Sequence, residues 1–346
     1  MTTPPARPTR RPRYAGRNPR RFHEKYKELD PARYAEDVDK VLASGKTPAG
    51  SHRSIMVSEI LAALRPQPGE VVADCTLGYG GHARTLLEAV LPGGRLLGLD
   101  VDPLELPRTE TRLRLAGFGP DVFTAHRSNF AGLPQVLAAE GLAAVNVMLA
   151  DLGVSSMQLD NPDRGFTFRE AGPLDMRMNP TRGEPASRLL ARLSVDKLAQ
   201  VLMDHADEPE ADLIATALTR TPIDTTRAAV AAIRAAFEHG RPGAGEADID
   251  KAIRRTFQAL RIAVNDEFSA LDAFLRNLSA CLAPGGRVAV LTFHSGEDRR
   301  VKKAFQAGLR DGLFSAIAED PERAAADEVR ANPRAASAKL RWAVRA

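Results

Sequence analysis

The sequence predicts an α/β fold in which a parallel sheet carries an inserted helical domain. Between about residues 52 and 160, short apolar segments typical of strands alternate with amphipathic segments typical of helices. The strand pattern disappears between about 160 and 255 and returns in RVAVLTFHS, residues 287–295. This alternation indicates right-handed crossovers between parallel strands, and ligands of such sheets bind beyond the carboxyl ends of the strands.

The first elements establish the alternation. SHRSIMVSEILAALRP (51–66) predicts a short helix that Pro66 stops, and GEVVADC (69–75) predicts a buried strand. A glycine-containing loop and a helix follow. The next elements are a strand in 93–102, a helix over about 104–116, a strand in 121–130, a helix over about 131–140 and a strand in 145–153.

The middle of the chain has helical spacing throughout. Ser194 and Thr225 precede two of its apolar stretches and are predicted N-caps. A long apolar stripe then runs from Phe257 to Leu282 with spacings of three and four, which predicts one long helix ending at APGG. We assign this stripe to the core and give it no chemistry.

Four regions follow from these patterns. They are an N-terminal arm and linker (1–50), a sheet domain in two parts (51–160 and 256–310), a helical insertion (161–255) and a C-terminal tail (311–346). Residues 1–27 hold nine Lys or Arg against one acid, with five prolines, so the arm is expected to be disordered on its own. Such an arm could contact nucleic-acid phosphates, act as a targeting peptide or only solubilise the chain.

Composition excludes several classes of protein. With 346 residues and 44% hydrophobic content, the chain can bury a full core. It has no apolar run long enough for a membrane span and no apolar N-terminal stretch of the secretory type. Its two cysteines, Cys75 and Cys281, are too few for a disulfide framework or a zinc site and are expected to be buried. A cytoplasmic location without membrane contact is therefore predicted.

The first motif is the glycine loop in DCTLGYGGHARTLLE (74–88). Gly78, Gly80 and Ala83 fit a relaxed dinucleotide pattern, and Asp100 lies where a ribose-binding acid is expected. However, Asp74 at the strand end would repel a pyrophosphate, and it suits a ligand that carries an ammonium group. S-adenosylmethionine is such a ligand, and Asp74 and the glycine loop are predicted to bind it. A dinucleotide and a plain tight turn remain the alternatives.

The second motif lies in residues 149–178. Asp151 is predicted to close the fourth strand, where a carboxylate could accept a hydrogen bond from an exocyclic amine and orient it. Its alternative role is to cap a turn. Arginines and phenylalanines are interspersed in the segment after Asp151. This pattern predicts that Arg164, Phe166 and Arg177 contact a flipped base. The alternative is that the phenylalanines only anchor the insertion.

The third motif is LTFHSGEDRRVKKAF (291–305). His294 leaves a strand and could relay a proton, whereas satisfaction by local hydrogen bonds is the alternative. Arg299 is a candidate RNA contact. It belongs to a run of charged residues that could also be only the solvated first turn of a helix.

Together these stretches resemble the bacterial ribosomal small-subunit methyltransferase H family, also called MraW. The resemblance covers residues 51–310 and a C-terminal patch, NPRAASAKLR. Its carriers are DCTLGYGGHA, GLDVDP, SNF, DLGVSSMQLDNPDRGFTFREAGPLDMRMNP, FQALRIAVNDE and LAPGGRVAVLTFHSGEDRRVK. The long block after Asp151 makes the resemblance specific.

The resemblance implies a class I (Rossmann-like) S-adenosylmethionine-dependent methyltransferase fold. It also implies methyl transfer to N4 of a cytosine in the decoding centre of 16S rRNA, in the small ribosomal subunit. No metal is expected, and the oligomeric state stays open. A methyltransferase of another RNA or of a protein amine, and a non-catalytic RNA-binding assembly factor, are the alternatives. The implied cofactor residues, to which the loop analysis adds Asp74 and Gly78, are Gly80, Gly81, His82, Asp100, Phe130, Asp151 and Gln158.

Four positions depart from the family's usual residues. Leu77 and Ala83 replace phenylalanine and serine beside the glycine loop, which are mild changes. Gly296 replaces leucine in the HSxED turn and adds backbone freedom. Ala336 replaces an arginine, which removes a possible phosphate contact.

Overall fold

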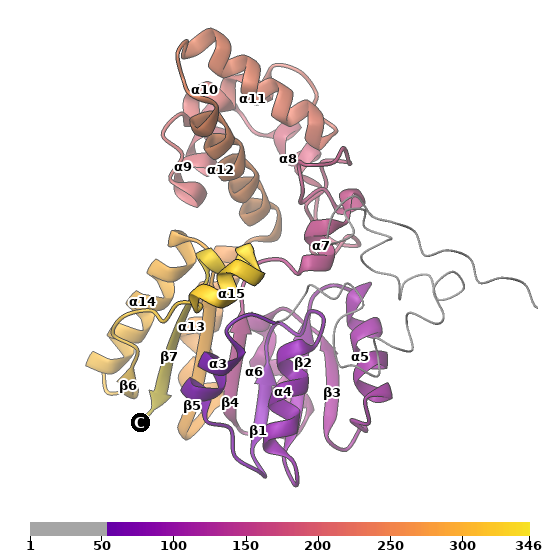
Figure 1. Cartoon of the computed structure of the whole chain (residues 1–346), viewed down its shortest axis with the longest axis vertical. Coiled ribbons are helices and arrows are strands. Elements are labelled where there is room, and N and C mark those ends of the chain that lie inside the picture. The colour runs from indigo at the N-terminus through magenta and orange to yellow at the C-terminus, as the bar shows by residue number, and fades with distance from the viewer. Residues whose placement is uncertain (1–53) are drawn as a thin grey trace, which may run out of the picture. The chain divides into compact units, whose positions relative to one another are not determined.

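A seven-stranded sheet forms the centre of the computed structural model, which describes residues 54–346. The arm over 1–50 therefore lies outside the described residues. The strands are β1 (Val71–Asp74), β2 (Arg95–Asp100), β3 (Phe123–Arg127), β4 (Val145–Asp151), β5 (Leu282–Thr292), β6 (Phe314–Ile317) and β7 (Lys339–Arg345). Their order is β3-β2-β1-β4-β5-β7-β6, and β1 to β5 are parallel (Figure 1). The predicted α/β class is confirmed.

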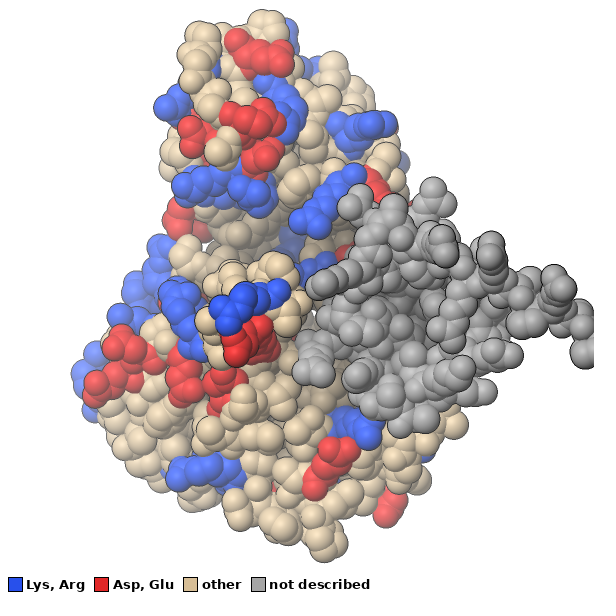
Figure 2. Space-filling view, viewed as in Figure 1, with Lys and Arg blue, Asp and Glu red and all other residues tan. Residues whose placement is uncertain are grey.

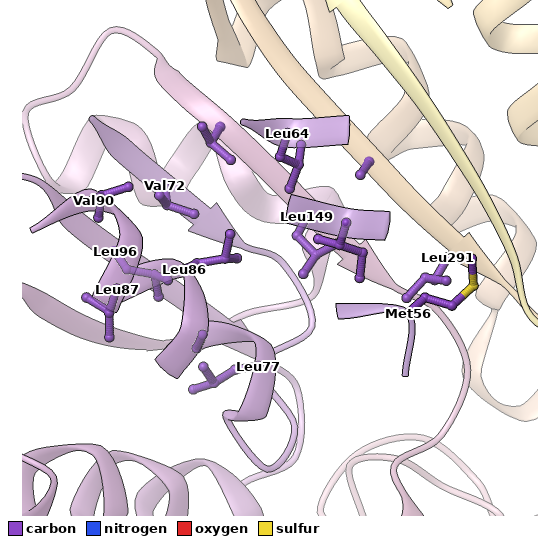
Figure 3. Packing of buried hydrophobic residues seen from close by; sticks show 14 of the residues in the cluster. Met56, Leu64, Val72, Leu77, Leu86, Leu87, Val90, Leu96, Leu149 and Leu291 are labelled. Carbon is purple, nitrogen blue, oxygen red and sulfur yellow. The ribbon is translucent and has the colours of Figure 1, made fainter. Parts of the chain in front are cut away.

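Both faces of the sheet are buried under helices. One face packs against α3 (Val57–Leu64), α4 (Gly81–Val90) and α5 (Glu105–Leu115), and the other against α6 (Leu133–Ala139), α13 (Glu267–Cys281) and α14 (Ser295–Arg310). Neighbouring strand residues alternate between the two cores: Leu149 and Leu291 face the first, and Met148 and Val290 the second. Figure 3 shows the first core, where Leu149 and Leu291 lie with Met56 and Leu64. Burial on both sides explains the nearly continuous apolar strand sequences.

The helical insertion follows β4 and has a core of its own. It begins with α7 (Ser156–Asp160) and continues with α8 (Ala186–Arg192), α9 (Val195–Ala206), α10 (Ala211–Thr219), α11 (Thr226–Gly240) and α12 (Glu246–Asn265). Leu202, Ile214 and Ile233 are fully buried in this core. Ser194 and Thr225 accept hydrogen bonds from the backbone of α9 and α11, which confirms both predicted N-caps.

The predicted long helix is two helices. Asp266, with a left-handed φ of 50°, separates α12 from α13. The predicted domain boundary at residue 256 falls inside α12, and this helix packs against the insertion core as far as Val264. The apolar stripe thus serves two different cores, and its unbroken spacing conceals the change.

Residues 311–346 complete the sheet. Strand β7 pairs antiparallel with both β5 and β6, and α15 (Ala326–Ala331) lies between β6 and β7 in the chain (Figure 1). Asp298 of α14 accepts hydrogen bonds from Arg341 at 2.7 Å and Lys339 at 2.9 Å. Burial raises the pKa of Asp298, but these two partners outweigh it and hold the pKa below its usual value. The segment predicted as a tail is therefore part of the sheet domain.

Two further expectations concern the interior. Cys75 and Cys281 are buried and unpaired, as predicted. No helix within residues 54–346 is long and apolar enough to cross a membrane.

Candidate active site

Three acids meet at the carboxyl edge of the sheet. Asp74, Asp100 and Asp151 end β1, β2 and β4, and β1 lies between the other two strands. Burial raises the pKa of Asp74 to about 6, and the charges of Asp151 and Asp100 add to this, although His82 and the Thr76 amide oppose it. Burial also raises the pKa of Asp100 to about 6. This concentration of carboxylates favours a positively charged ligand.

The glycine loop folds against Asp100. The Gly78 amide donates to Asp100 Oδ2 at 2.8 Å, and the Thr109 hydroxyl donates to the Gly78 carbonyl at 2.5 Å. Gly80 has a φ of 82°, and a Cβ there would lie 2.8 Å from Thr109 Cγ2. Only glycine fits this conformation and this close approach. Gly81 then starts α4.

Asp151 has one carboxylate oxygen without a partner. Its amide donates to Thr76 Oγ1 at 2.6 Å, which fixes the strand end. Oδ2 lies 3.6 Å from His82 Nε2, and His82 is buried as the second residue of α4. Asp151 Oδ1 and His82 Nε2 are buried and make no hydrogen bond within the described residues. Buried polar atoms are normally paired, so this pair indicates a ligand position.

A buried ion pair connects the site to the insertion. Asp102, 1% exposed, accepts from Gln158 Nε2 and Arg164 Nη1, both at 2.8 Å. Arg164 also donates to the carbonyls of Arg177 and Met178. Gln158 in turn forms a capping box with Ser155 at the start of α7. We call Asp102, Gln158 and Arg164 the Asp102 network; it joins the loop after β2 to residues 155–178.

The predicted RNA-binding residues separate into two groups. Arg164 is 8% exposed and Phe166 6% exposed, and both make internal contacts. For Arg164, the structure replaces the expected RNA contact with a structural role, because arginine interspersed with phenylalanine does not distinguish an interior from a surface. Phe166 also lines the pocket described below, so a base contact by Phe166 stays a prediction. Arg177 pairs with Asp175 at 2.7 Å, and Arg299 pairs with Asp207 at 3.0 Å with half its side chain exposed. RNA contact by these two stays a prediction.

Phe130 and His294 follow β3 and β5, the strands on either side of the three that carry the acids. Phe130 follows β3, is half-buried and packs edge-to-face on Phe274 with ring centroids 5.5 Å apart. His294 is the N-cap of α14, where Nδ1 accepts from the Glu297 amide at 3.4 Å. Its Nε2 lies 3.2 Å from Glu297 Oε1 without an aligned hydrogen bond. These are the local contacts expected if His294 only caps the helix. Proton relay by His294 stays a prediction.

A pocket of about 190 Å³ opens beside His294. Most of its walls are apolar, and four polar side chains reach it: Arg254, Gln258, Arg261 and His294. The sequence interpretation missed Arg261 and Gln258, because they lie within a helical stripe that was given no chemistry. Asp102 was also absent from the predicted site residues, and the only sequence feature that pointed to it was its place in the GLDVDP motif.

A family model described as the MraW methylase family matches residues 49–346. The chain belongs to the MraW methylase family. A ribosomal RNA small subunit methyltransferase H 2 of Alkaliphilus metalliredigens is 48% identical over 342 residues, covering 97% of each chain. A ribosomal RNA small subunit methyltransferase H 1 of Lachnoclostridium phytofermentans is 46% identical over 342 residues, covering 97% of this chain and 93% of the relative. A solved putative rRNA methylase of Clostridium thermocellum is 12% identical, covers 85% of this chain and 99% of its own, and has a TM-score of 0.40.

The methyl donor of this MraW methylase is S-adenosylmethionine, which supplies a methyl group activated by a sulfonium. The residues present fit it, because three acids at one strand edge suit a ligand with two positive charges. Asp100 and the loop from Gly78 to His82 would hold it, whereas a dinucleotide's pyrophosphate would be repelled.

Cofactor affinity is expected to fall as the pH falls through about 6, the pKa of Asp74 and Asp100. Protonation removes the negative charges that attract the cofactor, so Kd should rise roughly tenfold or more between about pH 7 and pH 5. The free protein should show the opposite trend in stability. Both pKa values are raised by folding from 3.8, so ionising these acids destabilises the fold as the pH rises from 3.8 to about 6.

Titration calorimetry of cofactor binding across this pH range tests the first expectation. Asp100→Asn should flatten the pH profile, whereas Asp121→Asn at an exposed position should retain it. A wild-type affinity that does not change with pH would contradict the electrostatic account.

Proposed function

We propose that this MraW methylase transfers a methyl group from S-adenosylmethionine to N4 of a cytosine in the decoding centre of 16S rRNA. The substrate is the small ribosomal subunit in the cytoplasm. The unpartnered Oδ1 of Asp151 at the cofactor edge carries the proposal. The names of relatives 46% and 48% identical support the RNA class of the substrate.

Asp151 meets the chemical requirement of this reaction. The exocyclic amine of cytosine is conjugated with its ring, so its lone pair must be turned toward the methyl donor. An N4–H hydrogen bond to Asp151 Oδ1 would orient the amine, and the hydrogen bond of the Asp151 amide fixes the backbone that carries this carboxylate. N4 gains a methyl group and must lose a proton. Asp151 would accept this proton, and His82, whose Nε2 lies 3.6 Å from Asp151 Oδ2, is the next titratable group.

The target cytosine must leave its stack to reach a buried carboxylate. RNA contacts that hold the surrounding nucleotides would come from arginines of the insertion and of α14, among them the partly buried Arg177 and the exposed Arg299. Figure 2 shows Lys and Arg on both the insertion and the sheet domain, interspersed with acids. This mixture favours local phosphate contacts over a uniformly basic face.

Nucleoside mass spectrometry tests the proposal. The protein is incubated with isotope-labelled S-adenosylmethionine and with either small subunits lacking decoding-centre methylation or naked 16S rRNA. The expected result is labelled N4-methylcytidine at one decoding-centre cytosine. Label on another nucleoside or on protein would overturn the target. Cofactor binding without any label would favour an RNA-binding assembly factor.

A further inference from the structure

We propose that the pocket beside His294 receives the target base, and that Arg261 orients this base by donating a hydrogen bond from Nη1 to its N3 atom. This inference rests on the proposed function and adds a residue that reads the base. Its evidence comes from the fixed guanidinium, its place beside the turn that follows Asp151 and the walls of the pocket.

The guanidinium of Arg261 is fixed with one nitrogen left over. Arg261 lies on α12 with 17% of its side chain exposed. Its Nε and Nη2 donate to the two carboxylate oxygens of Glu267, both at 2.9 Å. Nη1 makes no hydrogen bond within the described residues. A planar guanidinium held at two nitrogens presents its third nitrogen as a rigid donor.

This donor lies beside the chain segment that carries Asp151. A Cβ placed on Gly153, two residues after Asp151, would be 3.8 Å from Arg261 Nη1 and 3.9 Å from Phe293 Cδ2. Gly153 has a φ of 93°, so glycine permits the turn and leaves the space open. Arg261 Nη1 therefore lies next to the turn that follows Asp151, and Val154 of this turn lines the same pocket as Arg261.

This pair of groups complements cytosine. Its Watson–Crick edge presents the N4 amine as a donor next to N3 as an acceptor. Asp151 would accept from N4, and Arg261 would donate to N3. Uracil presents an N–H donor at N3, which would face the Arg261 donor without an acceptor between them. The same two residues thus place N4 for reaction and reject uracil.

The rest of the pocket suits a flat ring. Phe168 and Phe257 line it and pack edge-to-face with centroids 5.0 Å apart. Met176, also in the wall, has a left-handed φ of 64°. Asn265 holds this conformation by donating to the Met176 carbonyl at 2.8 Å and accepting from the Met178 amide at 2.7 Å. Rigid apolar walls with few polar groups are typical of sites that receive a flipped base.

Single-turnover methylation with two changes tests the N3 contact. One change is Arg261→Lys, which keeps a charge to pair with Glu267 but lacks the third nitrogen. The other is a subunit whose target cytosine is replaced by 3-deazacytosine, which lacks the N3 acceptor. Each change alone should lower the rate about 10- to 100-fold. Together they should lower it scarcely more than either alone, because both remove the same hydrogen bond.

Three controls keep the result interpretable. Arg255→Lys, on the same helix and paired with Glu208, should leave the rate unchanged. Cofactor affinity of Arg261→Lys should match the wild type, which shows that the site is folded. The wild type on 3-deazacytosine tests the contact without any protein change. Losses that multiply, or an undiminished wild-type rate on 3-deazacytosine, would overturn the inference. Failure of the wild type to methylate cytosine would instead overturn the proposed function.

Discussion

Replacing Asp151 with alanine is expected to lower the rate of methyl transfer by about 10²- to 10⁴-fold, the range of a lost acid–base group. The variant loses the only acceptor proposed for N4, whereas the hydrogen bond that fixes this strand end survives because it uses the Asp151 amide. The fold should therefore persist. Cofactor affinity should change much less than the rate, because Asp74 and Asp100 still supply negative charge.

Rapid-quench methylation at saturating cofactor measures this effect. Asp163→Ala, at an exposed position in the same segment, provides the comparison and should retain the wild-type rate. Asp151→Asn is expected to fall between the two, because its amide oxygen can still accept but carries no charge. Normal turnover by Asp151→Ala would remove this residue from the mechanism.

Replacing Arg164 with methionine is expected to lower the free energy of unfolding by about 3–5 kcal/mol. The change leaves Asp102, 1% exposed, as a buried carboxylate whose remaining side-chain partner is Gln158. It also removes the donors to the carbonyls of Arg177 and Met178. The cost comes mainly from the charge left behind, since desolvated charges without partners are strongly unfavourable.

Urea unfolding of three variants separates these causes. Arg169→Met, five residues away and exposed, should change stability by less than about 0.5 kcal/mol. The double variant Asp102→Asn and Arg164→Met should recover part of the loss, because no buried charge remains. A single-variant loss under about 1 kcal/mol would show that the buried pair contributes little.

The strands were predictable because their environment is simple. The segments predicted in 69–75, 93–102, 121–130 and 145–153 contain β1 to β4, and 287–295 overlaps β5, which begins five residues earlier at Leu282. A strand covered on both faces needs an apolar run, and the crossovers then place the ends of such strands at one edge. The meeting of Asp74, Asp100 and Asp151 followed from this rule and from their positions at the ends of the runs.

Other features depend on contacts that local sequence does not encode. A single left-handed residue, Asp266, divides α12 from α13 without disturbing the apolar spacing. Arg164 looked like a surface contact because its partner, Asp102, is 62 residues away in the chain. Arg261 looked like a polar residue in a core helix. Its fixed orientation depends on Glu267, which lies beyond the break at Asp266.

The position of β7 between β5 and β6 affects how the protein is made. β6 precedes β7 in the chain and pairs with no other strand within residues 54–346, so it has no place in this sheet until β7 has been synthesised. Until then, β5 is an open edge beside a finished parallel sheet, and such edges recruit strands of other chains. Nascent molecules that end before β7 are therefore expected to expose this edge. Chaperone binding at that stage would protect the β5 edge until Leu340 and Ala343 reach their positions in the two cores.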